Sequence, residues 1–155
     1  MNFPKKQLNS HQAKLKIARY CAFQDRCEYE VRIKLRDFGL NEDEIEELID
    51  FLIDEKYLDE NRFTHAYVQG KFNLKKWGKI KIKAHLRSKN VPESLVEKHL
   101  KNISEELYKS TITSLIQKKL VEVKEENPLI RKQKVIAYLQ QKGFEMELIF
   151  DCYQD

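Results

Sequence analysis

The stretch "LRDFGLNEDEI" (residues 35–45) decides the expected fold, because it has the features of one helix ending and another beginning. Gly39 suits the left-handed conformation in which many helices end, since glycine has no Cβ to clash there. Asn41 and Glu44 then have the spacing of a capping box, which begins a helix. The apolar residues that follow recur on one helix face: Ile45, Leu48, Ile49, Leu52 and Ile53. The stretch therefore predicts two helices joined by a tight turn.

The same pattern occurs three times, at intervals of about fifty residues. The stretches "LRSKNVPESLV" (residues 86–96) and "LQQKGFEMELI" (residues 139–149) align with the first one without a gap. Asn90 and Gly143 share the column of Gly39, and both residue types tolerate the left-handed conformation. We therefore predict an all-α fold of three tandem three-helix repeats, each resembling a helix-turn-helix. Repeats of this kind stack on their neighbours, so we expect an elongated, curved rod.

Helical spacing of the apolar residues continues through most of the chain. It predicts helices at residues 10–24, 28–38, 42–55, 59–73, 78–89, 92–101, 104–123, 128–141 and 145–153. Four segments are expected: a flexible N-terminus (1–9), a first repeat with its connecting helix (10–73), a second, basic repeat (74–123) and a third, truncated repeat (124–155).

The composition is that of a helical protein with a modest core. Of 155 residues, 41% are apolar and 35% charged, with only 4 glycines and 3 prolines, which favours long solvated helices over a turn-rich β fold. No apolar run approaches the roughly 20 residues of a membrane span, and no secretory signal follows the N-terminal lysines. Three cysteines without framework spacing fit a reducing compartment. We therefore expect a cytoplasmic monomer without membrane contact.

No constellation for catalysis or metal binding is visible in the sequence. The four glycines form no phosphate-binding loop, and no histidine has a second ligand one helical turn away. We expect the histidines to be exposed or partly buried, and Cys21 and Cys27 to be buried small apolar residues. The ten acids of residues 42–60 are interpreted as the solvated face of a helix. We therefore expect no enzymatic activity and no cofactor.

Residues 71–89 concentrate positive charge without a single acid. The cations are Lys71, Lys75, Lys76, Lys79, Lys81, Lys83, Arg87 and Lys89. Ile82 and Leu86 lie on one face of the helix expected here and should pack inward, which leaves the cations on the exposed circumference. Like charges at i, i+4 repel by a few tenths of a kcal/mol each, so this arrangement indicates a compensating polyanionic partner. Nucleic acid and an acidic protein surface both fit.

Two side chains near this basic segment allow two interpretations each. Trp77 could stack on a base of a nucleic acid, or it could pack against the start of the basic helix. Arg62 could brace two repeats through an acid of the previous helix, or it could reach a partner, and we favour the structural role. Phe63 and Tyr67 have i, i+4 spacing and are expected in the core.

Two segments together resemble the RecX family, the regulatory proteins of the RecA recombinase. They are "YLDENRFTHAYVQGK" (residues 57–71) and "KKWGKIKIKAHLRSKNV" (residues 75–91). The family pattern joins an aromatic-Leu-Asp-Asp/Glu-x-Arg-Phe-Ala segment to a basic helix that follows a glycine, and the resemblance covers roughly residues 12–153. The chain departs from it at Lys81, where Arg is usual, at Asn90, where Gly is usual, and at Thr64, where Ala is common. Lys81 keeps the charge but loses the fork of donors.

The resemblance implies three tandem three-helix units and a function without catalysis. It implies binding in the groove of the RecA–DNA filament, to RecA and to the single- or double-stranded DNA within it. It also implies inhibition of RecA ATPase, strand exchange and co-protease activity, and so control of recombination, DNA repair and the SOS response. The residues expected to bind the filament are Arg62, Lys71, Lys75, Lys76, Trp77, Lys79, Lys81, Lys83, Arg87 and Lys89. The alternatives are a stand-alone DNA-binding helix-turn-helix at residues 79–101, or a helical scaffold for another acidic protein.

Overall fold

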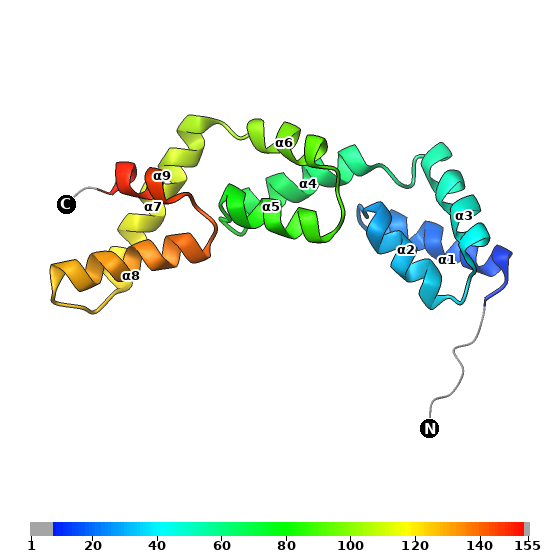
Figure 1. Cartoon of the computed structure of the whole chain (residues 1–155), viewed down its shortest axis with the longest axis horizontal. Helices are drawn as coiled ribbons and strands as arrows, with labels where there is room; N and C mark the ends of the chain where they lie inside the picture. The colour runs from blue at the N-terminus through cyan, green and yellow to red at the C-terminus, as the bar shows by residue number, and fades with distance from the viewer. Residues whose placement is uncertain (1–7, 154–155) are drawn as a thin grey trace, which may run out of the picture. The chain divides into compact units, whose positions relative to one another are not determined.

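The computed structural model describes residues 8–153, and in that range the chain forms nine α-helices and no β-strand (Figure 1). They are α1 (Ser10–Phe23), α2 (Glu28–Asp37), α3 (Glu42–Asp54), α4 (Glu60–Asn73), α5 (Lys79–Ser88), α6 (Glu93–Lys101), α7 (Glu105–Glu122), α8 (Pro128–Gln141) and α9 (Met146–Cys152). Each boundary lies within one residue of its predicted place, so the all-α prediction is confirmed. Most of the N-terminus predicted to be flexible, residues 1–7, lies outside the described residues.

The chain divides into two compact units. The first contains the residues up to Ala66 together with Lys89–Val91, and the second contains Tyr67–Ser88 and the residues from Pro92 onward. The curved rod expected from the sequence stays a prediction. None of the helices within residues 8–153 is long and apolar enough to cross a membrane.

The first unit has a core built mainly from α1, α2 and α3. Its buried residues have the spacing of one face on each helix: Ala13, Ile17 and Cys21 of α1, Val31 and Leu35 of α2, and Ile45, Leu48, Ile49 and Leu52 of α3. The predicted capping box is present, since Asn41 accepts the N–H of Glu44 and the Glu44 side chain accepts the N–H of Asn41. Ile53, the last residue of the predicted stripe, is instead half exposed. The buried stripe of α3 therefore consists of four residues and does not include Ile53.

The left-handed column predicted from the aligned repeats is confirmed. Gly39, Asn90 and Gly143 have φ angles of +85°, +56° and +96°, and each follows the end of a helix. Only glycine and a few polar residues adopt this conformation at low cost. The turn between the second and third helix of each repeat is therefore encoded by a single residue.

The second unit contains a close approach between two backbones that the sequence did not predict. The N–H of Gly78 donates to the carbonyl of Lys142 at 2.7 Å, and the N–H of Ile80 donates to that of Gly143 at 3.0 Å. A Cβ on Gly78 would lie 2.3 Å from the backbone of Gly143, so only glycine fits. This contact fixes the start of α5 against the turn between α8 and α9.

Tyr108 of α7 completes this junction from the inside. Its hydroxyl accepts the backbone N–H of Lys79 at 3.0 Å and donates to the Glu145 carboxylate at 2.8 Å. Its ring packs between Phe72 and Phe144, with centroid distances of 5.8 and 5.4 Å. Burial raises the pKa of Tyr108 well above its ordinary value, so the phenol stays a hydrogen-bond donor at neutral pH.

Candidate anion-binding surface

Helix α5 carries part of the basic segment that the sequence singled out; Lys71 lies in α4, and Lys75, Lys76 and Lys89 lie in the connections before and after α5. Ile82 and Leu86 are fully buried, as predicted, so the cations of α5 lie on its remaining circumference. Among the cations in and around α5, two groups can be distinguished. One group contacts carboxylates, and the other contacts no carboxylate of residues 8–153.

The first group, here called the paired flank, consists of Lys83, Arg87 and Lys89. The ammonium of Lys83 lies 2.5 Å from Glu97 and 3.5 Å from Glu93, and Arg87 lies 3.6 Å from Glu93. Both acids belong to α6. Hydrogen bonding raises the pKa of Lys83 and holds that of Glu97 below its ordinary value. The charge of this flank is therefore largely neutralised within the protein.

Lys89 completes the paired flank with a different partner. It lies in the turn between α5 and α6, and its ammonium is 3.4 Å from the carboxylate of Glu30 in α2. Both side chains are mostly buried, with exposed fractions of 28% and 21%. Lys89 therefore attaches this turn to α2 within the first unit.

The second group is here called the Trp77 cluster and consists of Trp77, Lys71, Lys76, Lys81 and Lys142. The ammonium groups of Lys71 and Lys81 lie 4.8 and 4.4 Å from the centre of the indole ring, within the range of a cation–π interaction. The imidazole of His85 lies against the same indole, at a centroid distance of 4.6 Å. Within residues 8–153, none of the four lysines pairs with a carboxylate. The cluster is therefore a local excess of positive charge.

Lys142 brings the third repeat into this cluster. Its ammonium donates to the backbone carbonyl of Lys75 at 2.9 Å, beside the Gly78–Gly143 contact. Burial lowers the pKa of Lys142, and the nearby charges of Lys81, Lys118 and Lys76 lower it further. No signal in the sequence pointed to Lys142, because it lies more than sixty residues from the other members and joins them only through the backbone contact.

The remaining predicted site residues have other surroundings. Lys75 has an exposed side chain, while its carbonyl accepts the bond from Lys142. The ammonium of Lys79 lies 4.8 Å from the centre of the Tyr108 ring. Along the chain, these two residues lie between members of the Trp77 cluster.

Arg62 has several partners inside the first unit. Its guanidinium lies 2.6 Å from Asp25, and it also donates to the carbonyls of Lys56 and Tyr57 at 3.2 Å each. The sequence had suggested that Arg62 pairs with an acid of the previous helix. Its partner Asp25 lies instead in the loop between α1 and α2. The geometry is that of a structural brace. Its place among the filament-binding residues stays a prediction.

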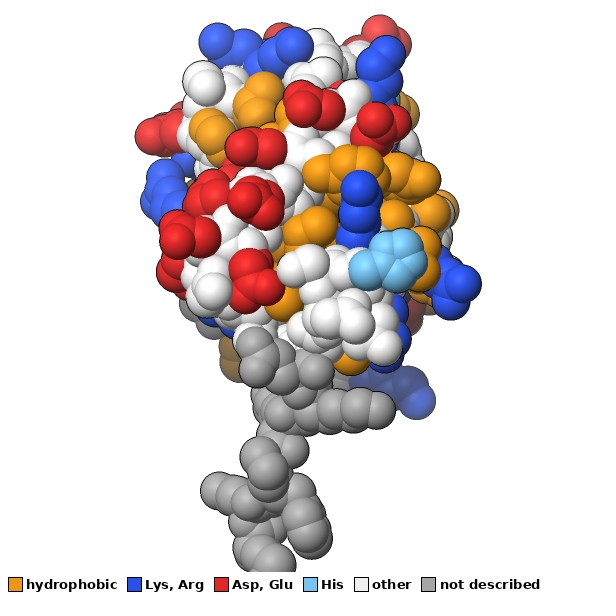
Figure 2. Space-filling model, turned by 90° about the vertical axis from the view of Figure 1, so that its right-hand side faces the viewer, with side chains coloured by type: hydrophobic (Ala, Val, Ile, Leu, Met, Phe, Trp, Pro, Cys, Tyr) orange, Lys and Arg blue, Asp and Glu red, His pale blue; other side chains and the backbone are white. Residues whose placement is uncertain are grey.

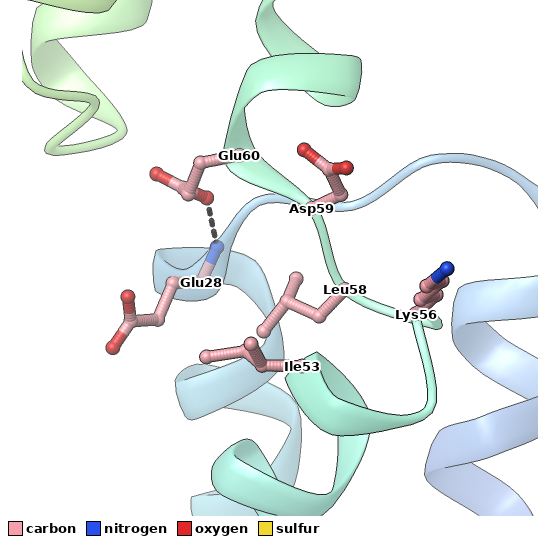
Figure 3. A pocket seen from close by; sticks show the side chains of 6 residues that line it. All are labelled: Glu28, Ile53, Lys56, Leu58, Asp59 and Glu60. Carbon is pink, nitrogen blue, oxygen red and sulfur yellow. Dashed lines mark hydrogen bonds between the residues drawn. The ribbon is translucent and has the colours of Figure 1, made fainter.

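Figure 2 shows acidic side chains gathered beside a strip of apolar atoms. On α3 most of the acids are exposed, as predicted. Glu60 at the start of α4 differs, because it is half-buried and accepts the N–H of Glu28 at 2.6 Å (Figure 3). It lines a cavity of about 320 Å³ whose other lining residues are Glu28, Ile53, Lys56, Leu58 and Asp59 (Figure 3).

Other expected features have mixed outcomes. Cys21 and Cys27 are buried, as predicted, and burial raises the pKa of their thiols to about 11 and about 12. His99 is buried, with an exposed fraction of 4%, so the prediction of exposed or partly buried histidines is wrong for this residue. No group of three metal-binding side chains comes together in the part of the chain that the structure describes.

Family models match nearly the whole described chain. They are described as the first, second and third three-helix domains of RecX, and they match residues 13–52, 59–100 and 105–152. These matches group α4 with the second domain and α7 with the third. The segment boundaries drawn from the sequence alone stay a prediction.

Curated proteins with similar sequences point to the same family. "Regulatory protein RecX" of Clostridium botulinum (strain Eklund 17B / Type B) is 32% identical over 130 residues, which is 83% of this chain and 60% of that protein. "Regulatory protein RecX" of Lactobacillus johnsonii is 28% identical over 144 residues, which is 93% of this chain and 53% of that protein. The chain thus spans between about half and three fifths of the length of these curated relatives.

Two solved structures share the fold. One, described as the crystal structure of regulatory protein RecX, has a TM-score of 0.82 and 25% identity, and covers 92% of this chain and 71% of that one. The other, RecX from Lactobacillus salivarius, has a TM-score of 0.83 and 24% identity, and covers 92% of this chain and 93% of that one. The three-repeat fold is therefore shared with these proteins.

Proposed function

This chain belongs to the RecX family, and on that premise we propose that it is a regulatory protein that binds the RecA–DNA filament and inhibits RecA. The inhibited activities are ATP hydrolysis, strand exchange and co-protease activity. The protein thereby limits recombination and tunes the SOS response. It acts by binding and carries out no chemistry of its own.

The Trp77 cluster is the observation that carries this proposal. Its four lysines are held near one another, and no acid of residues 8–153 pairs with them. Such an arrangement is destabilising for the protein alone and becomes favourable when an anionic partner binds. A nucleoprotein filament offers phosphates and acidic side chains at high density, so it is a suitable partner.

The paired flank argues against the stand-alone helix-turn-helix. That alternative places α5 in a DNA groove with its basic side chains towards the duplex. However, Lys83 and Arg87 already contact Glu93 and Glu97 of α6, so binding a duplex there would require breaking these ion pairs. It would also bring the two carboxylates close to DNA phosphates. The filament proposal uses the unpaired lysines instead.

Release of phosphate from ATP by RecA on single-stranded DNA tests the proposal. We expect the wild-type protein to slow phosphate release and the double variant Lys71→Glu/Lys81→Glu to lose most of this inhibition. The variant Lys16→Glu/Arg19→Glu is the matched control, because it makes the same change in charge on exposed positions of α1. Failure of the wild type to inhibit would refute the proposal. Equal inhibition by wild type and cluster variant would remove the Trp77 cluster from it.

A further inference from the structure

We infer that a cavity in the first unit receives a basic side chain of a partner protein. This cavity of about 320 Å³ lies between the end of α3, the loop that follows it, and the first residues of α2 and α4 (Figure 3). All of its lining residues belong to the first unit, whereas the Trp77 cluster belongs to the second. The inference therefore goes beyond the proposed function and does not depend on it.

One wall of the cavity is apolar. Leu58 and Ile53 form this wall, and Figure 3 shows both side chains extending toward the start of α2, where Glu28 lies. Leu58 is buried, but Ile53 is half exposed. Long basic side chains bury their methylene stems along apolar surface and keep the charged group in a polar environment. The exposed surface of Ile53 is therefore suited to cover the stem of such a side chain.

The rim of the cavity is acidic. Three of the lining residues carry carboxylates, and the one lining cation is Lys56. Glu28 pairs with Arg32 at 2.7 Å. Within residues 8–153, no ion pair includes Asp59, Glu60 or Lys56. Two carboxylates of the rim are therefore not paired with a cation of the described chain.

These two carboxylates are held in place by backbone donors. Asp59 accepts the N–H of Arg62 at 2.9 Å, and Glu60 accepts the N–H of Glu28 at 2.6 Å. Burial raises the pKa of Glu60, and the charges of Glu28, Glu30 and Asp59 add to the rise, which the N–H of Glu28 opposes. A cation that enters the cavity would offset the burial and the repulsion, and would meet acids that are already positioned.

The size and charge of the cavity restrict what it can bind. Its volume lies at the lower end of the usual range of ligand pockets, roughly 300–1,000 Å³, and suits one long side chain better than a nucleotide or cofactor. The unpaired carboxylates also repel phosphates. No group of three metal-binding side chains comes together within residues 8–153, so a metal ion would find too few ligands. A protein side chain fits better than a small free amine, because its neighbours also cover the exposed Ile53.

Nuclear magnetic resonance of the full, ¹⁵N-labelled chain tests this inference residue by residue. The probes are short peptides with one central arginine or lysine between two leucines, the same peptide with citrulline at the centre, and spermidine. Citrulline has the shape of arginine without its charge. We expect the basic peptides to shift the amide signals of Ile53, Leu58 and Glu60, and the citrulline peptide to leave them in place.

Three results of this titration would overturn the inference. The first is the absence of shifts at these residues with both basic peptides. The second is an equal response to the citrulline peptide, which would show that charge is not recognised. The third is a larger response to spermidine, which would assign the cavity to a small polyamine and not to a protein.

A double variant tests the two unpaired acids. Asp59→Asn/Glu60→Gln removes both charges but keeps the hydrogen bonds, since asparagine caps helices as well as aspartate does and glutamine retains an acceptor for the N–H of Glu28. We expect the affinity for the basic peptides to fall roughly tenfold, about threefold for each carboxylate. Asp43→Asn/Glu47→Gln is the matched control, because it makes the same chemical change at exposed positions of α3 outside the cavity. An equal loss of affinity in the two variants would overturn the cavity as the site.

A second copy of the chain is another source of basic side chains. Sedimentation velocity of the wild type and the double variant, at the protein concentrations of the titration, separates this source from a different protein. We expect both to sediment as monomers, which supports a different protein as the occupant. Self-association of the wild type that the double variant loses would overturn the inference, because the cavity would then bind another copy.

Discussion

The paired flank and, apart from Lys142, the Trp77 cluster come from one continuous basic segment, yet they use their charges in opposite ways. Lys83, Arg87 and Lys89 contact acids of α6 and α2. Lys71 and Lys81 contact an aromatic ring and no acid of residues 8–153. The difference shows that a run of cations in a sequence is not yet a binding surface. The acids that lie near it in space decide which cations are available to a partner.

The two groups should also differ in what they contribute to folding. A partly buried ion pair stabilises the native state modestly, and loss of one partner leaves the other without compensation. Unpaired cations placed close together raise the free energy of the native state, so they persist where binding benefits from them. Substitutions can separate these two contributions.

The largest effect is expected at the backbone contact that creates the cluster. Gly78→Ala would place a Cβ 2.3 Å from the backbone of Gly143, and neither segment is a flexible side-chain end that can move away. We expect the free energy of unfolding to fall by about 1–3 kcal/mol, the usual cost of overpacking. The fluorescence emission of Trp77 should shift as well, because the turn that carries Lys142 would move away from the Trp77 cluster. Chemical denaturation monitored by this fluorescence measures both.

Gly70→Ala is the matched control for this substitution. Gly70 lies inside α4, and a Cβ there would meet no atom within 4 Å. Alanine at a helix-interior position is more favourable than glycine by roughly 0.5–1 kcal/mol, so this variant should be more stable than the wild type. Equal destabilisation by both changes would show that the Gly78–Gly143 contact is not specific.

Neutralising each group tests the comparison directly. Lys71→Gln/Lys81→Gln should weaken binding of a single-stranded oligonucleotide roughly 20-fold at about 0.1 M salt, because two phosphate contacts are lost. Lys83→Gln/Arg87→Gln removes the same charge but should change the affinity less than about twofold, since those cations are already paired. Both affinities come from titrations followed by the fluorescence of Trp77. A similar loss in the two variants would abolish the distinction between flank and cluster.

For single substitutions, the loss of stability should be larger in the paired flank than in the Trp77 cluster, which is the reverse of the order expected for DNA binding. Lys89→Gln is expected to lower the free energy of unfolding by about 1 kcal/mol, because Glu30 loses its partner in a partly buried place. Lys71→Gln should change stability by less than about 0.5 kcal/mol. Urea denaturation of the two variants, beside the wild type, gives the comparison. A greater loss at Lys71 than at Lys89 would contradict the assignment of roles.

The fold was largely predictable from sequence because its signals are local. A left-handed residue, a cap and a helical stripe each involve neighbours in the chain, as in Gly39, Asn41 and Glu44, and the threefold recurrence of the pattern supported each one. Ile53 is the exception, because it is half exposed. The spacing of apolar residues shows which face of α3 packs inward, but not where along α3 the helices packed against it end.

The candidate site was predictable only in part, because its outcome depends on contacts between distant segments. The sequence placed the cations of residues 71–89 but not Glu30, which lies far upstream and neutralises Lys89. It likewise gave no sign of Lys142, since two glycines in different repeats carry no local signal of touching each other. Pairing across repeats is a tertiary property, and single-sequence periodicity does not contain it.

The smallest effect is expected at Glu60. It tests whether an unpaired negative charge lowers stability as the unpaired positive charges of the Trp77 cluster are expected to do. Burial raises the pKa of Glu60 above its ordinary value of 4.5, and the charges of Glu28, Glu30 and Asp59 add to the shift although the N–H of Glu28 opposes it. Because the folded-state pKa is raised, the stabilisation from a protonated Glu60 is complete below pH 4.5 and is lost as the pH rises through the folded-state value. Glu60→Gln keeps an acceptor for that N–H without the charge. We therefore expect a gain of about 0.5 kcal/mol at pH 7 and none at pH 4, measured by thermal denaturation.

Glu47→Gln is the control for this change, since it removes one carboxylate charge at an exposed position of α3. A loss of stability in Glu60→Gln at pH 7 would mean that the carboxylate gains more from the N-terminus of α2 than it loses by burial next to other acids. Glu60 would then behave as a capping residue and not as an unpaired charge. In that case unpaired charge would carry a stability cost in the Trp77 cluster alone, and the lysines there would be the stronger indication of a binding partner.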